Sequence, residues 1–215
     1  GLEQNQLDRL NALYDLMRME LPAHLRDIDT NPIAPNPGGT GNMAEPSLHR
    51  AYKRKRVGGS PEYQGAECLY MILTMGMGKE GVRSGDASRI AAGDYDNDGL
   101  PEFHDAWGRP ISFLRWAPGF ISDAQPAVLP EDNPSPFDPL GINVTATTGQ
   151  RLIPLIYSAG PDQIYDIGTQ GGAASYDPYQ YLNRGLRSDQ TSPFGGPNGR
   201  DDSIDNIHNH NLDAR

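Results

Sequence analysis

Three aspartates alternate along residues 94–98, and a glycine follows them at once. This order matches the first half of a calcium-binding loop, in which carboxylates at positions 1, 3 and 5 precede a glycine that makes a sharp turn at position 6. Continuing the count adds a backbone carbonyl at position 7 and carboxylates at positions 9 and 12. We therefore predict a calcium site whose ligands are Asp94, Asp96, Asp98, Leu100, Glu102 and Asp105.

The second half of this loop departs from the usual pattern. Position 12 holds Asp105, where calcium loops usually carry a glutamate that binds through both of its oxygens. Pro101 and a predicted strand from Ile111 stand where an EF-hand would continue into a helix. The alternative to a calcium site is therefore an acidic turn in contact with solvent.

The composition of the 215-residue chain limits its class of fold and of partner. Its 25 glycines and 19 prolines favour long irregular loops and exclude an all-helical bundle, and the length suits one domain, residues 1–215. The formal net charge of −10 makes a nucleic-acid partner unexpected, because phosphate contacts need clustered basic residues. Cys68 is the single cysteine, so neither an internal disulfide nor a thiolate metal site is expected.

No familiar catalytic pattern occurs in the sequence. Neither G-x-S-x-G nor H-E-x-x-H is found. Residues 76–81 match G-x-G-x-x-G, but they lack the apolar helix that follows the glycines of a dinucleotide site. His208 and His210 have no third zinc ligand nearby in the sequence and are interpreted as part of a polar tail. We therefore expect no enzymatic activity.

Hydrophobic periodicity predicts two helices. Apolar residues recur every three or four positions along residues 2–21, and polar residues, Asp15 and Arg18 among them, occupy the opposite face. A second helix is predicted over residues 60–75, because a serine and a proline stand at its start. Residues 27–48 between the helices are expected to be a loop.

Strands are predicted in the second half of the chain. Residues 111–116 and 152–158 have strand character, and Pro154 argues that the later strand lies at the edge of its sheet. A weaker strand is expected near residues 142–147, and residues 163–200 have no periodicity. The fold class is therefore α+β, with helices first and a small antiparallel sheet after them.

Three segments occur in an order that resembles the soluble domain of the type II secretion major pseudopilin, within the type IV pilin-like superfamily. Residues 105–110 are similar to its D-P-W-G-x-P turn, residues 158–162 to its strand end S-x-G-x-D-G, and residues 202–212 to its closing segment D-D-I-x-N-W. The departures from the family's proline, glycine and tryptophan are Ala106, Gln163 and His210.

The resemblance implies a pilin-like fold, in which an N-terminal helix packs on a small antiparallel β-sheet with long irregular loops. Residues 1–22 would be the C-terminal half of a longer helix. Its upstream half would anchor the precursor in the inner membrane and then form the filament core, which makes the location periplasmic or extracellular. Residues 163–200 would be an inserted loop. Family members also bind calcium between the second and third motifs, which implies as further ligands Asp162, Asp202 and Asp205.

We therefore expect a non-catalytic structural subunit of a type II secretion pseudopilus or type IV pilus-like filament, stabilised by calcium. Its partners would be further copies of itself and other pseudopilins, and basic residues 50–56 could meet an acidic face of a neighbouring subunit. The alternative is a calcium-dependent cell-surface or adhesion module that binds glycan or protein through Tyr176, Tyr179 and Tyr181.

Overall fold

The fold is α+β, as the sequence predicts. The computed structural model describes residues 2–56, 58, 62–76, 91–117, 120–126, 136–137, 153–165, 167 and 207–211. Its helices are α1 (Leu2–Glu20), α2 (Leu25–Asp29), α3 (Ser47–Lys55) and α4 (Gln64–Met71), with a π-helical turn at Ile72–Gly76. Its strands are β1 (Ala92–Gly93), β2 (Glu102–Phe103), β3 (Ser112–Leu114), β4 (Leu155–Ser158) and β5 (Ile207–His208), the last followed by a 3₁₀ turn at Asn209–Asn211. The weak strand predicted near 142–147 and most of the loop 163–200 lie outside the described residues.

The strands form two antiparallel sheets. β1 pairs with β2, while β4 lies between β3 and β5, with Phe113 opposite Ile156 and Tyr157 opposite His208. The prediction that residues 152–158 form an edge strand was therefore wrong. Pro154 precedes β4, and its carbonyl accepts a hydrogen bond from the Asn209 amide. Its missing N–H thus costs the sheet no ladder bond.

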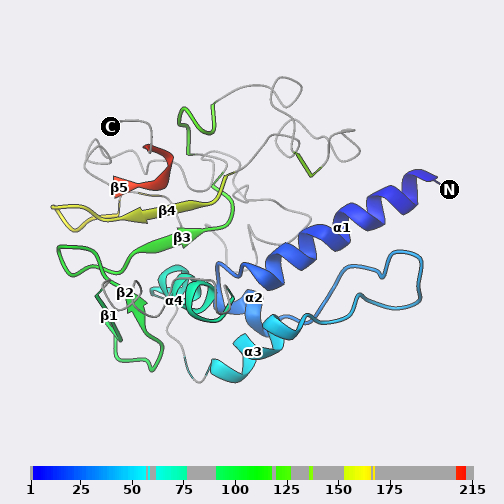
Figure 1. Ribbon diagram of the computed structural model, residues 1–215, viewed down its shortest axis with the longest axis horizontal. Coiled ribbons are helices and arrows are strands. Elements are labelled where there is room, and N and C mark those ends of the chain that lie inside the picture. Colours follow the sequence, from blue (N-terminus) through cyan, green and yellow to red (C-terminus); the bar gives the residue numbers. More distant parts are fainter. Residues whose placement is uncertain are drawn as a thin grey trace.

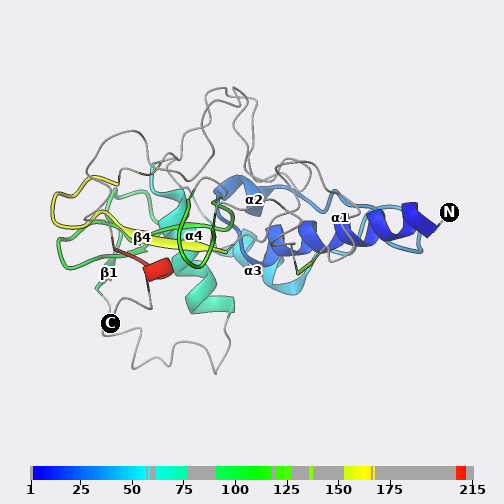
Figure 2. The same ribbon diagram turned by 90° about the horizontal axis from the view of Figure 1, so that it is seen from above.

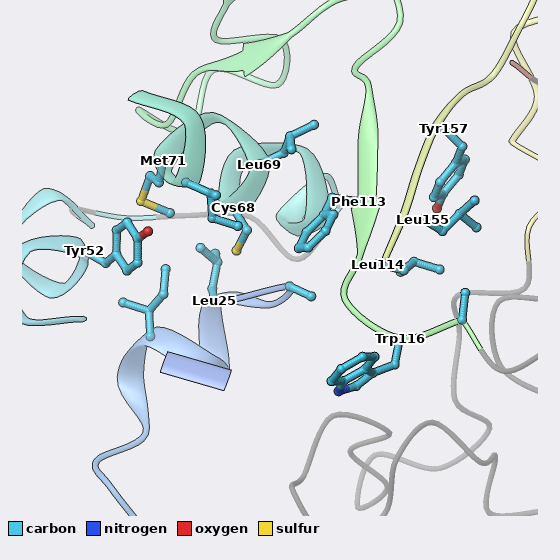
Figure 3. Packing of buried hydrophobic residues seen from close by; sticks show 14 of the residues in the cluster. Leu25, Tyr52, Cys68, Leu69, Met71, Phe113, Leu114, Trp116, Leu155 and Tyr157 are labelled. Atoms are coloured by element: carbon cyan, nitrogen blue, oxygen red, sulfur yellow. The ribbon is translucent and has the colours of Figure 1, made fainter. Parts of the chain in front are cut away.

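Helix α4 is the helix that packs on the strands, against β2 and β3 (Figure 1). Its backbone approaches β3 closely, because a Cβ on Gly65 would lie 2.7 Å from the carbonyl oxygen of Phe113. The core runs from Tyr52 and Met71 to Leu155 on β4 (Figure 3). The helix begins at Gln64, later than the predicted start at residue 60, which lies outside the described residues.

The predicted N-terminal helix is confirmed as α1, but its nearest neighbours are α2 and α3, whereas the pilin-like resemblance implied that this helix packs on the sheet. The N-terminal end of α1 lies at the side of the molecule farthest from the strands (Figures 1 and 2). Tyr14 is buried, and Met17 and Leu21 are partly buried against the common core. Within the described parts of the chain, none of the helices has both the length and the apolar character that crossing a bilayer requires.

The polar face of α1 is not all exposed, which corrects the simple amphipathic prediction. Asp15 and Arg18 are buried and form an ion pair at 2.8 Å. The segment after α2 covers them: Asp15 accepts the N–H groups of Ile33 and Ala34 at 2.7 and 2.9 Å. Arg18 donates to the carbonyl of Asp27 at 2.7 Å. Residues 27–48, predicted as a loop, therefore contain the end of α2 and the start of α3, and the segment between these helices acts as a polar cover for α1.

Asp27 joins the helices to the sheet. Its carboxylate accepts hydrogen bonds from Arg115, just beyond β3, at 2.9 Å and from the N–H of Ala23 at 3.0 Å. The same Arg115 nitrogen donates to the carbonyl of Leu21 at 2.8 Å, at the end of α1. His49 of α3 donates through Nε2 to the Asp27 carbonyl at 3.0 Å. Asp27, Ala23, Arg115 and His49 are all buried, so the hydrogen bonds of one residue connect α1, α2, α3 and the end of β3.

Replacing Asp27 with asparagine would leave the Arg115 guanidinium buried without its counter-charge. Breaking a buried ion pair costs about 3–5 kcal/mol, so Asp27→Asn should lower the free energy of unfolding by about this amount in urea denaturation. Asp29 on the same helix offers a matched control, because its side chain is 51% exposed and pairs with Arg56 at the surface. Asp29→Asn should cost less than about 1 kcal/mol. Equal losses in the two variants would contradict the central role of Asp27.

Candidate metal centre

Four carboxylates meet beside α4 and could hold a metal ion. They belong to Glu67 on α4, to Asp96 and Asp98 in the loop between β1 and β2, and to Glu102 on β2. Each offers one oxygen, and these oxygens all lie within 4.8 Å of one another. Carboxylate oxygens suit hard cations such as calcium, magnesium or manganese better than zinc or copper.

Three of the four residues in this cluster, Glu67, Asp96 and Glu102, have buried carboxylate oxygens without a hydrogen-bond donor. Glu67 and Glu102 are both 0% exposed. No hydrogen-bond donor reaches either oxygen of Glu67 or either oxygen of Asp96. Glu102 has one donor, because its Oε2 accepts the N–H of Tyr95 at 2.9 Å while its Oε1 accepts none. Buried polar groups are almost always paired. A bound cation would satisfy these oxygens together.

Burial and mutual repulsion raise the pKa of the two glutamates. The pKa of Glu67 rises to about 9, first because burial penalises its charge, then because the Asp98 carboxyl and the other acidic groups lie close to it. Burial also raises the pKa of Glu102 to about 7, although the Tyr95 N–H opposes the shift. Without a cation, Glu67 therefore holds a proton at neutral pH. A cation would displace it.

Asp94, the first of the three predicted loop carboxylates, shapes the loop and lies outside the four-carboxylate cluster. Its two oxygens accept the N–H groups of Asp98 and Gly99 at 3.0 and 2.9 Å. Asn97 and Gly99 have φ angles of 61° and 99°, so the loop turns through the left-handed region that glycine and asparagine tolerate best. Leu100, predicted to offer its carbonyl, buries its side chain in the core and anchors the end of the turn.

Asp105, the predicted twelfth ligand, is also outside the cluster, and both of its oxygens have donors. Oδ1 accepts the N–H groups of Trp107 and Arg109 at 2.9 and 2.8 Å. Oδ2 accepts the hydroxyl of Ser158 at 2.6 Å. Asp105 therefore closes the turn at residues 105–110 and fastens it to the end of β4.

The second predicted calcium site has one member in the described part of the chain. Asp162 lies in the turn after β4, where its Oδ1 accepts the N–H of Ile164 at 2.9 Å. Asp202 and Asp205 lie outside the described residues, so this ligand set stays a prediction.

Tyr95 holds the acidic loop, residues 94–101 between β1 and β2, against its surroundings. The ring of Tyr95 makes edge contacts with Tyr63 and His104, at centroid distances of 5.2 and 5.8 Å. Arg109 donates to the Tyr95 hydroxyl at 2.8 Å. Arg109 belongs to the turn closed by Asp105, so this hydrogen bond joins the acidic loop to that turn.

Glu67 is the cluster member that the sequence analysis missed. Its sequence signal was a glutamate between Ala66 and Cys68, within the apolar part of a predicted helix. Acidic residues are almost never fully buried unless they are paired. That rule singles out Glu67 as unusual, but only the fold shows that it faces a loop far along the chain.

The histidines near the C-terminus are structural, which corrects their interpretation as part of a polar tail. His208 lies in β5, and His210 is buried with its Nδ1 2.8 Å from the hydroxyl of Ser122. Burial lowers the pKa of both rings. Cys68 is fully buried, and burial raises its thiol pKa well above the usual range, in keeping with an unreactive core residue.

No protein-family model, curated protein or solved structure matches this chain. The chemistry of the acidic cluster is therefore inferred from its own geometry.

The cluster predicts an unusual pH dependence in the presence of a chelator. The folded-state pKa of Glu67, about 9, lies above its ordinary value of 4.5. Its protonation therefore stabilises the fold below that ordinary value, and this stability is lost as pH rises towards 9. Glu102 acts in the same direction up to its pKa of about 7. The melting temperature in chelator should thus fall between pH 5 and 9.

The variant Glu67→Gln should flatten most of this slope, because it removes the titrating group with the larger shift. Glu62→Gln is a suitable control, since Glu62 is exposed just before α4. A wild-type melting temperature that rises with pH over this range would contradict the assignment.

Proposed function

We propose that this protein is a non-catalytic structural subunit of a type II secretion pseudopilus or a related type IV pilus-like filament, with a fold stabilised by calcium. The arrangement of α1 carries the proposal. Its second half is buried among α2, α3 and the core, while its first turns lie far from the strands (Figures 1 and 2). An N-terminal helix that leaves the body in this way suits a subunit that assembles through an upstream continuation of that helix.

Contacts between the motif segments support the same proposal. The turn at residues 105–110 is bonded to Ser158 at the end of β4 through Asp105. Tyr165, beyond that strand, donates its hydroxyl to the carbonyl of Pro110. The described part of the third segment forms β5, which pairs with β4, and the 3₁₀ turn that follows it. The three segments that resemble one family thus lie against one another around β4.

Oxygen-only ligands support the calcium part of the proposal. The acidic cluster has neither a thiolate nor an imidazole, and its loop carries the glycine turn of calcium-binding loops. Periplasmic and extracellular fluids, the locations proposed for such a subunit, are where a calcium-dependent fold would be expected to form. Its partners would be other copies of the chain and related pseudopilins.

The N-terminal segment of the native protein gives a direct test. The protein would be isolated from the membrane and sheared surface fractions of its host, and its N-terminal peptides would be identified by mass spectrometry. We expect an apolar stretch of about 20 residues that runs directly into α1. A cleaved signal peptide with no apolar helix after it would reject the filament role and favour the calcium-dependent adhesion module.

The basic end of α3 is the surface that we expect to meet an acidic face of a neighbouring subunit. Two of its basic residues already have partners in the same chain: Lys53 pairs with Glu45, and Arg56 pairs with Asp29. Arg54 and Lys55 are exposed. Reversal of these two charges therefore disturbs the surface without breaking a described ion pair.

The double variant Arg54→Glu, Lys55→Glu should reduce the amount of sheared filament several-fold in electron micrographs. Its melting temperature should stay within about 2 °C of the wild type, because surface substitutions cost about 0.5 kcal/mol or less. Arg26→Glu, an exposed change on neighbouring α2, serves as the control. Normal filaments from the double variant would remove this surface from the proposal.

A further inference from the structure

The acidic loop does not supply the ligand that usually closes a calcium site. In a standard loop, a carboxylate at position 12 binds calcium through two oxygens. Here that position is Asp105, whose oxygens accept two backbone N–H groups and the hydroxyl of Ser158. It lies outside the four-carboxylate cluster. A calcium ion at this loop therefore needs its closing carboxylate from another part of the fold.

Glu67 is placed to supply it. Its side chain is 0% exposed, and both of its oxygens are buried without a hydrogen-bond donor. The carboxylate faces the loop, because α4 packs on β2 and Glu67 meets Asp96, Asp98 and Glu102 there. A buried carboxylate with no donor and three acidic neighbours is costly unless a proton neutralises it or a cation compensates it.

We propose that Glu67 is the closing ligand of a calcium site whose other carboxylates are Asp96, Asp98 and Glu102. This inference rests on the calcium part of the proposed function and is independent of the filament part. The spacing of the four oxygens, at most 4.8 Å, suits one ion. Calcium–oxygen bonds of 2.3–2.6 Å place ligands on opposite sides of the ion about 5 Å apart.

The ligand from α4 changes what the ion does to the fold. In a standard loop all the protein ligands come from one short segment, so the ion orders that segment alone. Here the ion would fasten a core helix to the loop between β1 and β2. The ring contact between Tyr70 and Phe103, at 4.9 Å, joins the same helix and strand beside the site. Calcium would therefore stabilise the packing of α4 as well as the loop.

Calcium titration of four variants tests this assignment. Isothermal titration calorimetry would be run on the wild type and on Glu67→Gln, Asp96→Asn, Asp105→Asn and Asp162→Asn, with thermal melts in calcium and in chelator. Glu67→Gln should weaken calcium binding by about tenfold or more, as should Asp96→Asn, because ligand charge sets affinity in such sites. Asp105→Asn should lower the melting temperature in chelator and leave the calcium affinity within about twofold.

Two readouts separate a ligand from a residue that only supports the fold. Glu67→Gln should melt at the same or a higher temperature than the wild type in chelator at pH 8, since it removes a buried acid. It should also lose most of the calcium-induced rise. For the wild type, that rise should be roughly 5–10 °C, because saturation at 100 times the dissociation constant adds about 2.7 kcal/mol.

Each other outcome overturns the inference in a different way. Wild-type affinity in Glu67→Gln, with binding lost in Asp105→Asn, would show a standard twelve-residue loop. Loss of binding in Asp162→Asn alone would place the ion in the turn after β4. Failure of the wild type to bind millimolar calcium would reject both the site and the calcium part of the proposed function. None of these results bears on the N-terminal peptide, so the filament part stands or falls separately.

Discussion

The buried charge at Asp27 is the constraint on which the rest of the fold depends. It accepts a hydrogen bond from Arg115 beside β3, while its own backbone carbonyl receives Arg18 of α1 and His49 of α3. A buried ion pair adds little net stability compared with apolar packing, but breaking it is costly. Its value here is geometric, because charges that need particular partners allow only one placement of the helices relative to the sheet.

A second buried acidic region in the same molecule follows the opposite rule. The carboxylates of Asp15 and Asp27 have a guanidinium and backbone N–H donors, whereas Glu67 and Asp96 have no donor for either oxygen. The fold therefore satisfies Asp15 and Asp27, the two buried aspartates that connect its helices and its sheet. The contrast sets the acidic cluster apart as a place where a cation could supply the missing compensation.

Local patterns predicted the parts of this structure that depend on local spacing. The periodicity of α1 and the alternation of acids that brings Asp96 and Asp98 together are both properties of short segments. The burial of Asp15 and Arg18 could not be predicted in this way, because their partners are backbone groups contributed by the segment after α2. The place of Glu67 in the cluster could not be predicted either, because its neighbours Asp96, Asp98 and Glu102 lie much later in the sequence. The twelfth position of the calcium-loop pattern pointed to Asp105, which is not a member of the cluster. Its two oxygens instead accept hydrogen bonds from its own turn and from Ser158.

The bond between Arg115 and the end of α1 also has a mechanical consequence. The guanidinium donates to the carbonyl of Leu21 and to Asp27, so the last turn of α1 is held by charge-assisted hydrogen bonds beside β3. Tension applied along the axis of α1 would pass through this joint into the sheet of β3, β4 and β5, and it would reach the acidic loop only indirectly, through α4 and the turn at residues 105–110. Hydrogen bonds of this kind resist small displacements more sharply than a sliding apolar contact does. A pull on the helix would therefore load the sheet before it could disturb the acidic cluster.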